Sequence, residues 1–169
     1  MSITLTKSKP ARRPVASKAA STNTVSCVGV VHSQIHGLKS KTGAVELSPG
    51  QLIECIRVGL PVQELEALQT SLNMPIDKLA PKLGISKATL HRRKAQGRLG
   101  QEESDRVLRF ARLMGKAVEV MEGEDSARRW LTSPQVGLGG ATPLDYAETE
   151  VGAREVEDLL GRIEYGVYS

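Results

Sequence analysis

Aromatic side chains are scarce in this sequence of 169 residues, which holds one Phe, one Trp and three Tyr. A core with so few rings must be built from Leu, Ile, Val, Ala and Met, and such a core suits packed helices. A chain of this length can bury one substantial core or two small ones. The composition therefore predicts a small all-α protein with an aliphatic interior.

Long apolar runs are absent as well. No stretch of 18 consecutive apolar residues occurs, so we expect no membrane-spanning segment. The basic N-terminus has neither a continuous apolar segment nor a cleavage-site pattern, which argues against a secretory signal. The two cysteines, Cys27 and Cys55, show no metal-ligand or redox spacing, and the cytosol keeps such thiols reduced. We therefore expect a cytoplasmic protein with two reduced cysteines.

Acidic residues are missing from the first 45 positions, which carry seven Lys or Arg. Residues 119–169 show the opposite balance, with eleven acidic residues against four Arg. The two ends of the chain are therefore expected to meet different partners. Residues 1–45 are rich in Ser, Thr, Lys and Gly and lack helical periodicity, which predicts a basic tail that is partly ordered at most. Within this tail, residues 24–32 are the candidate for a short strand.

Helical periodicity begins at Leu47. Ser48 as a helix cap and Pro49 at the first helical position predict a helix that stops at Gly59. The next helix carries its apolar residues on one stripe and closes at Asn73. Further helices are predicted over residues 75–84, 86–97 and 101–121, then a short helix ending at Ser133 and a final amphipathic helix from residue 151.

The stretch from Lys82 to Gly100 holds six Lys or Arg and no acidic residue. Its surroundings match a helix-turn-helix, which needs a small residue, a turn glycine, an apolar plug, a helix cap and an inward apolar residue at set offsets. The residues at these positions are Ala80, Gly84, Ile85, Ser86 and Leu90. The pattern predicts a recognition helix for double-stranded DNA.

The outer face of this helix carries the residues predicted to contact DNA. With Leu90 facing inward and 100° per residue, Arg92 lies on the opposite face, between Ala88 and Ala95. An Arg there reaches guanine O6 and N7, and an alanine methyl meets thymine. Cations around it contact phosphates, and Lys82 is one of them. The predicted DNA-binding residues are Ser86, Lys87, Ala88, Thr89, His91, Arg92, Lys94 and Arg98.

A helical hairpin with solvated charges is the alternative to DNA binding. Arg93, one turn after Leu90, occupies a position that is usually apolar in this motif. The second helix is then expected to be short or to end in a loop. We favour DNA binding over this alternative.

The last helix has an apolar stripe that leads to the end of the chain. Four of the five aromatic residues lie in the last forty positions, which indicates a protein interface. The pattern fits equally well a helix that completes the core of the molecule itself. Gly161 costs about 1 kcal/mol relative to Ala, so a backbone or a partner is expected to approach closely there. The stripe consists of Val156, Leu159, Leu160, Ile163 and Val167.

A set of residues in this half carries a resemblance to a known family. The marks are Trp130-Leu131, Pro134, Gly139-Gly140, Pro143-Leu144-Asp145, Gly152, Leu159 and the ending GRIEYGVYS. With these marks the segment from Ala127 to Ser169 resembles the C-terminal toxin-binding domain of the Xre/MbcA/ParS antitoxins. The preceding helix-turn-helix corresponds to the family's Xre-like DNA-binding half. The resemblance covers residues 47–169 and does not extend to the basic tail over 1–45. We therefore expect that tail, a DNA-binding and dimerisation region over 46–121, and a toxin-binding domain over 122–169.

The resemblance also implies a function. A family member is the antitoxin of a type II system, pairs with a RES-domain toxin that depletes NAD, and represses the shared promoter. Because a lone helix-turn-helix covers little DNA and operator palindromes mirror a two-fold protein, we expect a homodimer on operator DNA. Its C-terminal end lies at the mouth of the toxin's active-site cleft. A free carboxylate on Ser169 would pair there with cations that hold the dinucleotide's phosphates. The toxin-binding residues expected from this are Trp130, Leu159, Arg162, Ile163, Tyr165, Gly166, Val167, Tyr168 and Ser169.

Two rival functions remain to be weighed. Residues 137–142, GLGGAT, are similar to a dinucleotide fingerprint but lack its third glycine and a preceding strand, which favours a turn. Cys27, His32 and His36 would form a metal trio without a fourth ligand nearby. Three histidines with no paired acid give no catalytic constellation, so we expect no enzyme, no cofactor and no metal. The second rival is a free-standing helix-turn-helix regulator whose acidic C-terminal region only oligomerises.

Overall fold

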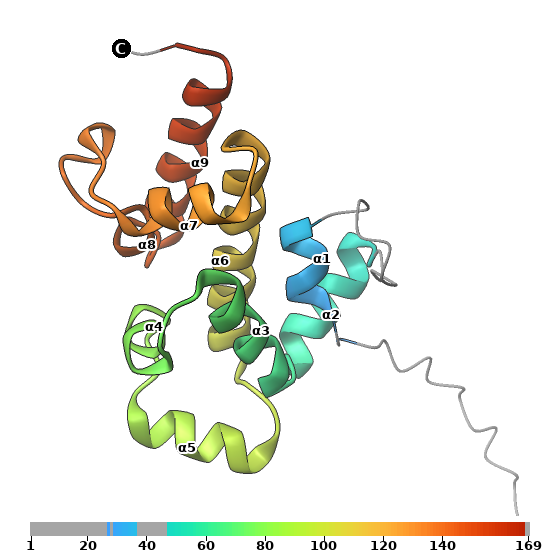
Figure 1. Ribbon diagram of the computed structural model, residues 1–169. Coiled ribbons are helices and arrows are strands. Elements are labelled where there is room, and N and C mark those ends of the chain that lie inside the picture. The colour runs from blue at the N-terminus through green and yellow to red at the C-terminus, as the bar shows by residue number, and fades with distance from the viewer. Residues whose placement is uncertain (1–26, 28, 37–46, 168–169) are drawn as a thin grey trace, which may run out of the picture.

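The computed structural model of the protein describes Cys27, residues 29–36 and residues 47–167 (Figure 1). Every regular element in these ranges is a helix, which confirms the all-α class. None of these helices is both long enough and apolar enough to cross a bilayer. The elements are α1 (Val30–His36), α2 (Pro49–Val58), α3 (Val62–Leu72), α4 (Ile76–Lys82), α5 (Lys87–Gln96), α6 (Gln101–Val120), α7 (Glu124–Thr132), the 3-10 helix η2 (Val136–Leu138), α8 (Pro143–Tyr146) and α9 (Glu150–Glu164).

Local signals set the helix ends as predicted. At the start of α2, the Ser48 N–H donates to Gln51 Oε1 at 2.9 Å and the Gln51 N–H donates to Ser48 Oγ at 3.4 Å. These reciprocal bonds form a capping box, and Pro49 follows in the first turn, where an N–H is not needed. Helices α3 and α5 end at Asn73 and Gly97, whose φ values of 48° and 73° lie in the left-handed region.

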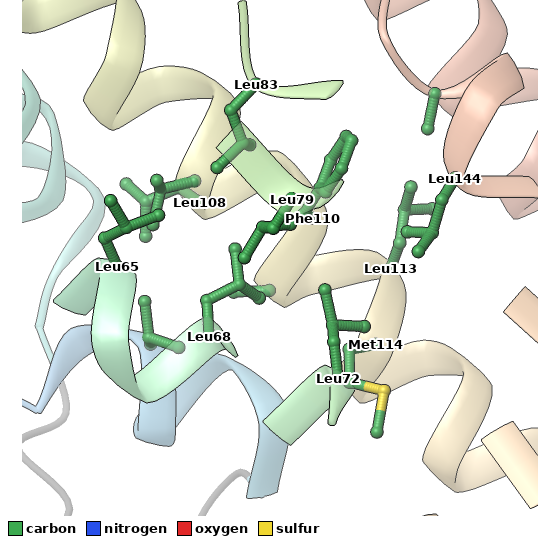
Figure 2. Packing of buried hydrophobic residues seen from close by; sticks show 14 of the residues in the cluster. Leu65, Leu68, Leu72, Leu79, Leu83, Leu108, Phe110, Leu113, Met114 and Leu144 are labelled. Carbon is green, nitrogen blue, oxygen red and sulfur yellow. The ribbon is translucent and has the colours of Figure 1, made fainter. Parts of the chain in front are cut away.

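Helix α6 is the centre of the molecule, and α1, α2, α3, α7 and α9 pack around it (Figure 1). Its buried stripe includes Phe110, Leu113 and Met114. Figure 2 shows this stripe among leucines from α3, α4 and α8. Each fully buried side chain of this size contributes about 1.5–3 kcal/mol. All buried apolar residues of the described chain form one connected cluster, so α6 joins the two halves through a shared core.

The N-terminal segment departs from the predicted organisation. Residues 30–36 form helix α1 and not the strand expected within residues 24–32, of which 24–26 and 28 lie outside the described residues. Helix α1 packs against α3 and α6, with Val31 buried between them. A Cβ on Gly115 of α6 would lie 2.2 Å from the Gln34 carbonyl oxygen, so a glycine is required for this approach. The strand prediction is wrong because a short apolar run does not by itself distinguish a strand from a buried helix.

Two further contacts hold α1 in place. Glu64 of α3 is 2% exposed, and its carboxylate accepts hydrogen bonds of 2.7 Å from the N–H groups of Gly29 and Val31. It thereby satisfies donors at the helix start that have no partner within the helix. Cys27 forms a disulfide with Cys55 of α2, so the expectation of two reduced cysteines is wrong. The cysteines are 28 residues apart, and only the docking of α1 brings their Cα atoms to 5.7 Å.

Ion pairs fasten α9 along α6. Arg112 Nε lies 2.6 Å from Glu157 Oε1, and Lys116 Nζ lies 2.6 Å from Glu164 Oε2. Such partly exposed pairs contribute at most about 1 kcal/mol each. Together they fix the direction in which α9 and the chain end leave the core.

Candidate functional site

Helices α4 and α5 and the turn between them have the predicted helix-turn-helix arrangement. Ala80 and Ile85 are buried, and Gly84 holds φ at 66°, where a side chain would be strained. Ser86 caps α5, because its Oγ accepts a 3.1 Å hydrogen bond from the backbone N–H three positions later. Leu90 packs against the core. Each position that carried the prediction has the role assigned to it.

The outer face of α5 is exposed, and no residue of this helix is buried. Lys87, Arg92 and Lys94 make no hydrogen bond or ion pair with any residue that the structure describes. Ala88 and His91 are exposed beside them. A helical face of small and unpaired basic side chains can enter the major groove of DNA.

Arg93, the residue that departs from the motif, has a partner in α6. Its Nε lies 2.7 Å from Oε2 and 3.1 Å from Oε1 of Glu103. Glu103 Oε2 also accepts the Gly100 N–H at 2.6 Å, so one carboxylate both caps α6 and neutralises Arg93. An ion pair takes the place of the usual apolar contact, and α5 therefore continues to Gln96.

Two cations predicted to contact phosphates are occupied within the chain. Lys82 Nζ pairs with the carboxylate of Asp145 in α8. Arg98 Nη1 donates a 2.9 Å hydrogen bond to the carbonyl of Gly59. Both contacts link the helix-turn-helix to neighbouring parts of the fold, which the sequence pattern did not indicate.

The two hydroxyl groups in the predicted DNA-binding set bond to each other. Ser86 Oγ donates to Thr89 Oγ1 at 3.0 Å and accepts the Thr89 N–H, so the Ser86 side chain is engaged in capping α5. The Thr89 hydroxyl accepts in this bond and keeps its own proton. Lys87, Arg92 and Lys94 have no partner among the described residues, and the imidazole of His91 is exposed nearby.

The two adjacent glycines of the C-terminal motif form the turn between η2 and α8. Gly139 and Gly140 hold φ at 64° and 87°, which reverses the chain between η2 and α8. Leu138 and Leu144 are buried on either side, so the turn is pinned at both ends. The prediction of a turn over residues 137–142 is confirmed.

The backbones of α8 and α9 approach each other closely at Gly152, where no close approach was predicted. A Cβ on Gly152 would lie 1.8 Å from the Tyr146 carbonyl oxygen, so α8 and α9 can meet only at a glycine. A Cβ on Gly161 would meet no heavy atom of the rest of the described chain within 4 Å. No group of the described chain therefore makes the close approach that was expected at Gly161.

The apolar stripe of α9 divides between core and surface. Val156 and Leu160 are completely buried, whereas Leu159 and Ile163 are half-buried on the flank of the helix. Val167 beyond the helix end is exposed. Helix α9 therefore combines the two roles that the sequence left open: its inner side completes the core, and its outer side presents an apolar edge.

Val136 of η2, which the sequence analysis did not select, is 97% exposed. The residue after it, Gly137, packs on α9: a Cβ there would lie 2.9 Å from Leu159 Cδ1. Val136 therefore extends the exposed edge of α9, and Tyr165, at 79% exposure, continues it at the other end. The only sign of Val136 in the sequence is that an apolar side chain stands in a glycine-rich turn, where polar residues are usual. The C-terminal apolar edge comprises Val136, Leu159, Ile163, Tyr165 and Val167.

The other predicted toxin-binding residues have mixed environments. Trp130 is partly buried and packs against the core. Arg162 and Gly166 are exposed. Tyr168 and Ser169 lie outside the described residues.

Helix α6 also holds the last turn of α9 beside this edge. The hydrogen bond that the Lys116 amine donates to the Glu164 carboxylate raises the pKa of Lys116 above its ordinary value of 10.5. Partial desolvation opposes this effect, and the charges of Glu164, Glu119 and Tyr165 add to it. The Lys116 ammonium therefore stays charged at neutral pH, and its ion pair with Glu164 restrains the turn that precedes Tyr165.

These two surfaces define a helix-turn-helix protein with a second binding surface at its C-terminal end. Comparison with known families assigns both halves. The family model of the antitoxin Xre-like helix-turn-helix domain matches residues 51–112. The model of the antitoxin Xre/MbcA/ParS C-terminal toxin-binding domain matches residues 116–166. The two matches meet within α6.

Individual relatives that match most of the chain belong to the same family. An antitoxin Xre of Yersinia enterocolitica is 36% identical over 135 residues, which cover 79% of this chain and 87% of the relative. An antitoxin Xre of Photorhabdus laumondii is 36% identical over 113 residues, or 66% and 76% of the two chains. A Prs ADP-ribosylating antitoxin of Sphingobium is 28% identical over 132 residues, or 72% and 83%. The chain belongs to the Xre/MbcA/ParS family of antitoxins.

Family membership decides between the functions weighed from sequence. The protein is a type II antitoxin with a helix-turn-helix and a toxin-binding domain, and it is not an enzyme. A toxin-binding domain also argues against a free-standing regulator whose C-terminal region only oligomerises. The disulfide removes Cys27 from the candidate metal trio, and His36 Nδ1 instead faces Glu124 Oε1 at 3.7 Å.

Proposed function

We propose that this antitoxin neutralises a RES-domain toxin that depletes NAD, and that its C-terminal end blocks the toxin's active-site cleft. The observation that carries the proposal is the C-terminal apolar edge, in which Val136 and Tyr165 are 97% and 79% exposed. Apolar side chains exposed on two elements in contact, here η2 and α9, mark an interaction surface on a small protein. The edge runs along α9 toward the chain end, so a partner that covers it also meets the last residues.

The chemistry of an NAD-consuming cleft suits such a chain end. The cleft must hold an anionic dinucleotide, so it presents cationic groups to the phosphates. The rings of Tyr165 and Tyr168 would fill the space of the nucleotide. We assign residues 122–169 to toxin binding on this basis.

The DNA-binding half is proposed to repress the promoter shared with the toxin. The unpaired donors on α5 suit this role, with Arg92 reading a guanine and Lys87 and Lys94 contacting phosphates. Operator palindromes mirror a two-fold protein, and half-sites lie about 34 Å apart, one turn of DNA. We therefore assign dimerisation to residues 46–121 and expect a homodimer in solution.

Co-expression with the product of the neighbouring gene tests the proposal. The toxin alone should lower the cellular NAD concentration, and co-expression of the antitoxin should restore it and yield a stable complex on purification. A neighbouring gene product that leaves NAD unchanged would contradict the proposed toxin class. Light scattering of the antitoxin, free and on operator DNA, tests the homodimer, and a monomer in both states would exclude it.

A further inference from the structure

We propose that the outer face of α2 is the contact through which two copies of this chain meet, with the two α2 helices antiparallel about a two-fold axis. The residues of this face are Ile53, Glu54, Arg57 and Val58. The inference rests on the homodimer proposed above and assigns its contact surface. It commits to one partner, a second copy of the chain.

The face points away from the core of its own molecule. Successive residues of a helix are about 100° apart, so its four side chains share an arc of about 140°. Leu52 and Ile56, which pack against the core, lie on the opposite side of the helix. Ile53 and Val58, at the two edges of the arc, are 50% and 54% exposed. Covering these aliphatic side chains with a partner would remove apolar surface from water, which favours association.

The two charged residues of the face have no partner within the described chain. Glu54 and Arg57 are exposed and stand three positions apart, a spacing at which opposite charges on a helix can pair. Neither side chain makes a hydrogen bond or an ion pair with any residue that the structure describes. Both charges are therefore available to a second molecule.

The order of these residues along the helix is self-complementary. In a two-fold contact, residue i of one copy meets residue j of the other, and j meets i. An axis that crosses α2 midway between Glu54 and Arg57 brings the acid of each copy to the base of the other. The same axis brings Ile53 of each copy to Val58 of the other, because both pairs are centred on the same point of the helix. A parallel arrangement would oppose each charge to its own copy, and this repulsion favours the antiparallel pair.

The position of α2 suits a pair that binds a toxin and DNA at other surfaces. Figure 1 shows α2 on one side of α6 and the helices α8 and α9 on the other, so the C-terminal apolar edge stays open. The segment after α2 is bonded to the segment after α5: the Leu99 N–H donates to the Leu60 carbonyl at 2.8 Å, and Arg98 donates to the Gly59 carbonyl at 2.9 Å. Contact at α2 would therefore set the distance between the two recognition helices.

The size of the face determines how strong the pair is. Helix α2 has 10 residues and is about 15 Å long. A stable interface buries about 800 Å² on each partner, which is more than one helix of this length covers. We therefore expect a reversible pair in solution, which forms more completely where neighbouring operator half-sites hold two copies together.

Sedimentation equilibrium of the full-length protein without DNA tests the proposal. Glu54→Arg and Arg57→Glu each place like charges opposite one another, so each should raise the dissociation constant of the dimer by about tenfold or more. An equimolar mixture of the two variants should restore association, because the mixed pair opposes acid to base at both contacts. A chain that carries both changes should associate like the wild type, because acid and base exchange places.

A matched control and a second measurement complete the test. Glu155→Arg makes the same change of charge as Glu54→Arg, on an exposed side chain of α9 that has no partner in the described chain, and should leave the dissociation constant unchanged. Mobility shifts on the operator repeat the comparison, since cooperative occupation of two half-sites requires the same contact between copies.

The other outcomes overturn the proposal in distinguishable ways. Unchanged association of both single variants would exclude α2 from the interface and leave the homodimer itself standing. Weakened association that neither the mixture nor the double change restores would mean that the changes act within each chain. Rescue by the mixture alone would indicate a parallel contact in place of the antiparallel one. A wild-type protein that is monomeric both free and on operator DNA would contradict the proposed homodimer as well.

Discussion

Arg93 of α5 and Glu103 of α6 form an ion pair, with Nε 2.7 Å from Oε2, at a position where the motif usually has an apolar contact. The side chains are 23% and 12% exposed, so the pair is largely shielded from water. It joins the end of the recognition helix to the central helix of the fold.

Changing Arg93→Ala should lower the free energy of unfolding by about 1–3 kcal/mol, because Glu103 then keeps only its bond to the Gly100 N–H. Urea denaturation measures this change. Lys94→Ala is the matched control, since Lys94 is exposed and has no partner in the described chain. It should leave the free energy of unfolding unchanged and lower the salt slope of DNA binding by about 1. Equal stability of the two variants would show that the pair does not hold α5.

Arg92 lies on the free outer face of α5, where we expect it to contact a base. Arg92→Ala should weaken operator binding by about 1–3 kcal/mol and relax the preference at one base position. Mobility-shift titrations against operator variants measure both effects. Toxin neutralisation should be unchanged, because the apolar edge is untouched. An operator affinity equal to that of the wild type would show that another element contacts the bases.

The end of the chain is expected to carry the inhibition. Deleting residues 165–169 should restore NAD depletion by the toxin, even where the remaining edge keeps the complex together. DNA binding should be nearly unchanged, because α5 belongs to the other half. If the truncated antitoxin still silences the toxin fully, inhibition comes from the surface of residues 123–164.

Val136 is expected to contact the toxin although it is remote in sequence from the chain end. Val136→Asp should weaken the complex by about 1–2 kcal/mol, because it places a charge in an apolar interface. Val151→Asp is the matched control, since Val151 is a valine of similar exposure, 74%, at the start of α9 and is not part of the edge. Calorimetric titration of the toxin compares them, and thermal unfolding should be alike for both. Equal binding by the two variants would exclude η2 from the interface.

The Lys116–Glu164 pair predicts a stability change at alkaline pH. The pKa of Lys116 is raised in the folded state above 10.5, so folding favours the protonated amine. The stabilisation is therefore complete below pH 10.5 and disappears as the pH rises through the raised pKa. Because the pair is partly exposed, the effect should not exceed about 1 kcal/mol. Urea unfolding of wild type and Lys116→Met should differ at pH 9 and converge above the raised pKa of Lys116. A constant difference would mean that the methylene contacts and not the charge stabilise the helix end.

The helices and the helix-turn-helix could be predicted from the sequence because their signals are local. Ser48, Ser86 and Gly97 act on backbone groups within a few positions of themselves, and Gly84 permits a conformation that other residues avoid. The exposed face of α5 follows from helical periodicity once Leu90 is placed inward. The free state of Arg92, Lys87 and Lys94 agrees with that derivation.

Contacts between distant residues carry no such signal, and only the tertiary structure decided them. Lys82 and Arg98 looked like phosphate ligands until packing brought Asp145 and the Gly59 carbonyl to them.

The same dependence on tertiary packing explains why the docking of the N-terminal segment and the exposure of the apolar edge could not be predicted from the sequence. Cys27 and Cys55, and the cap that Glu64 provides to α1, depend on a docking that joins residues about 30 positions apart. The exposure of Val136 depends on how η2 rests on α9. The sequence alone determined which residues form helices and which face of α5 is free, because those choices depend on neighbours along the chain. Tertiary packing decided which charges and apolar groups remain available to partners, since burial and pairing are properties of the assembled fold.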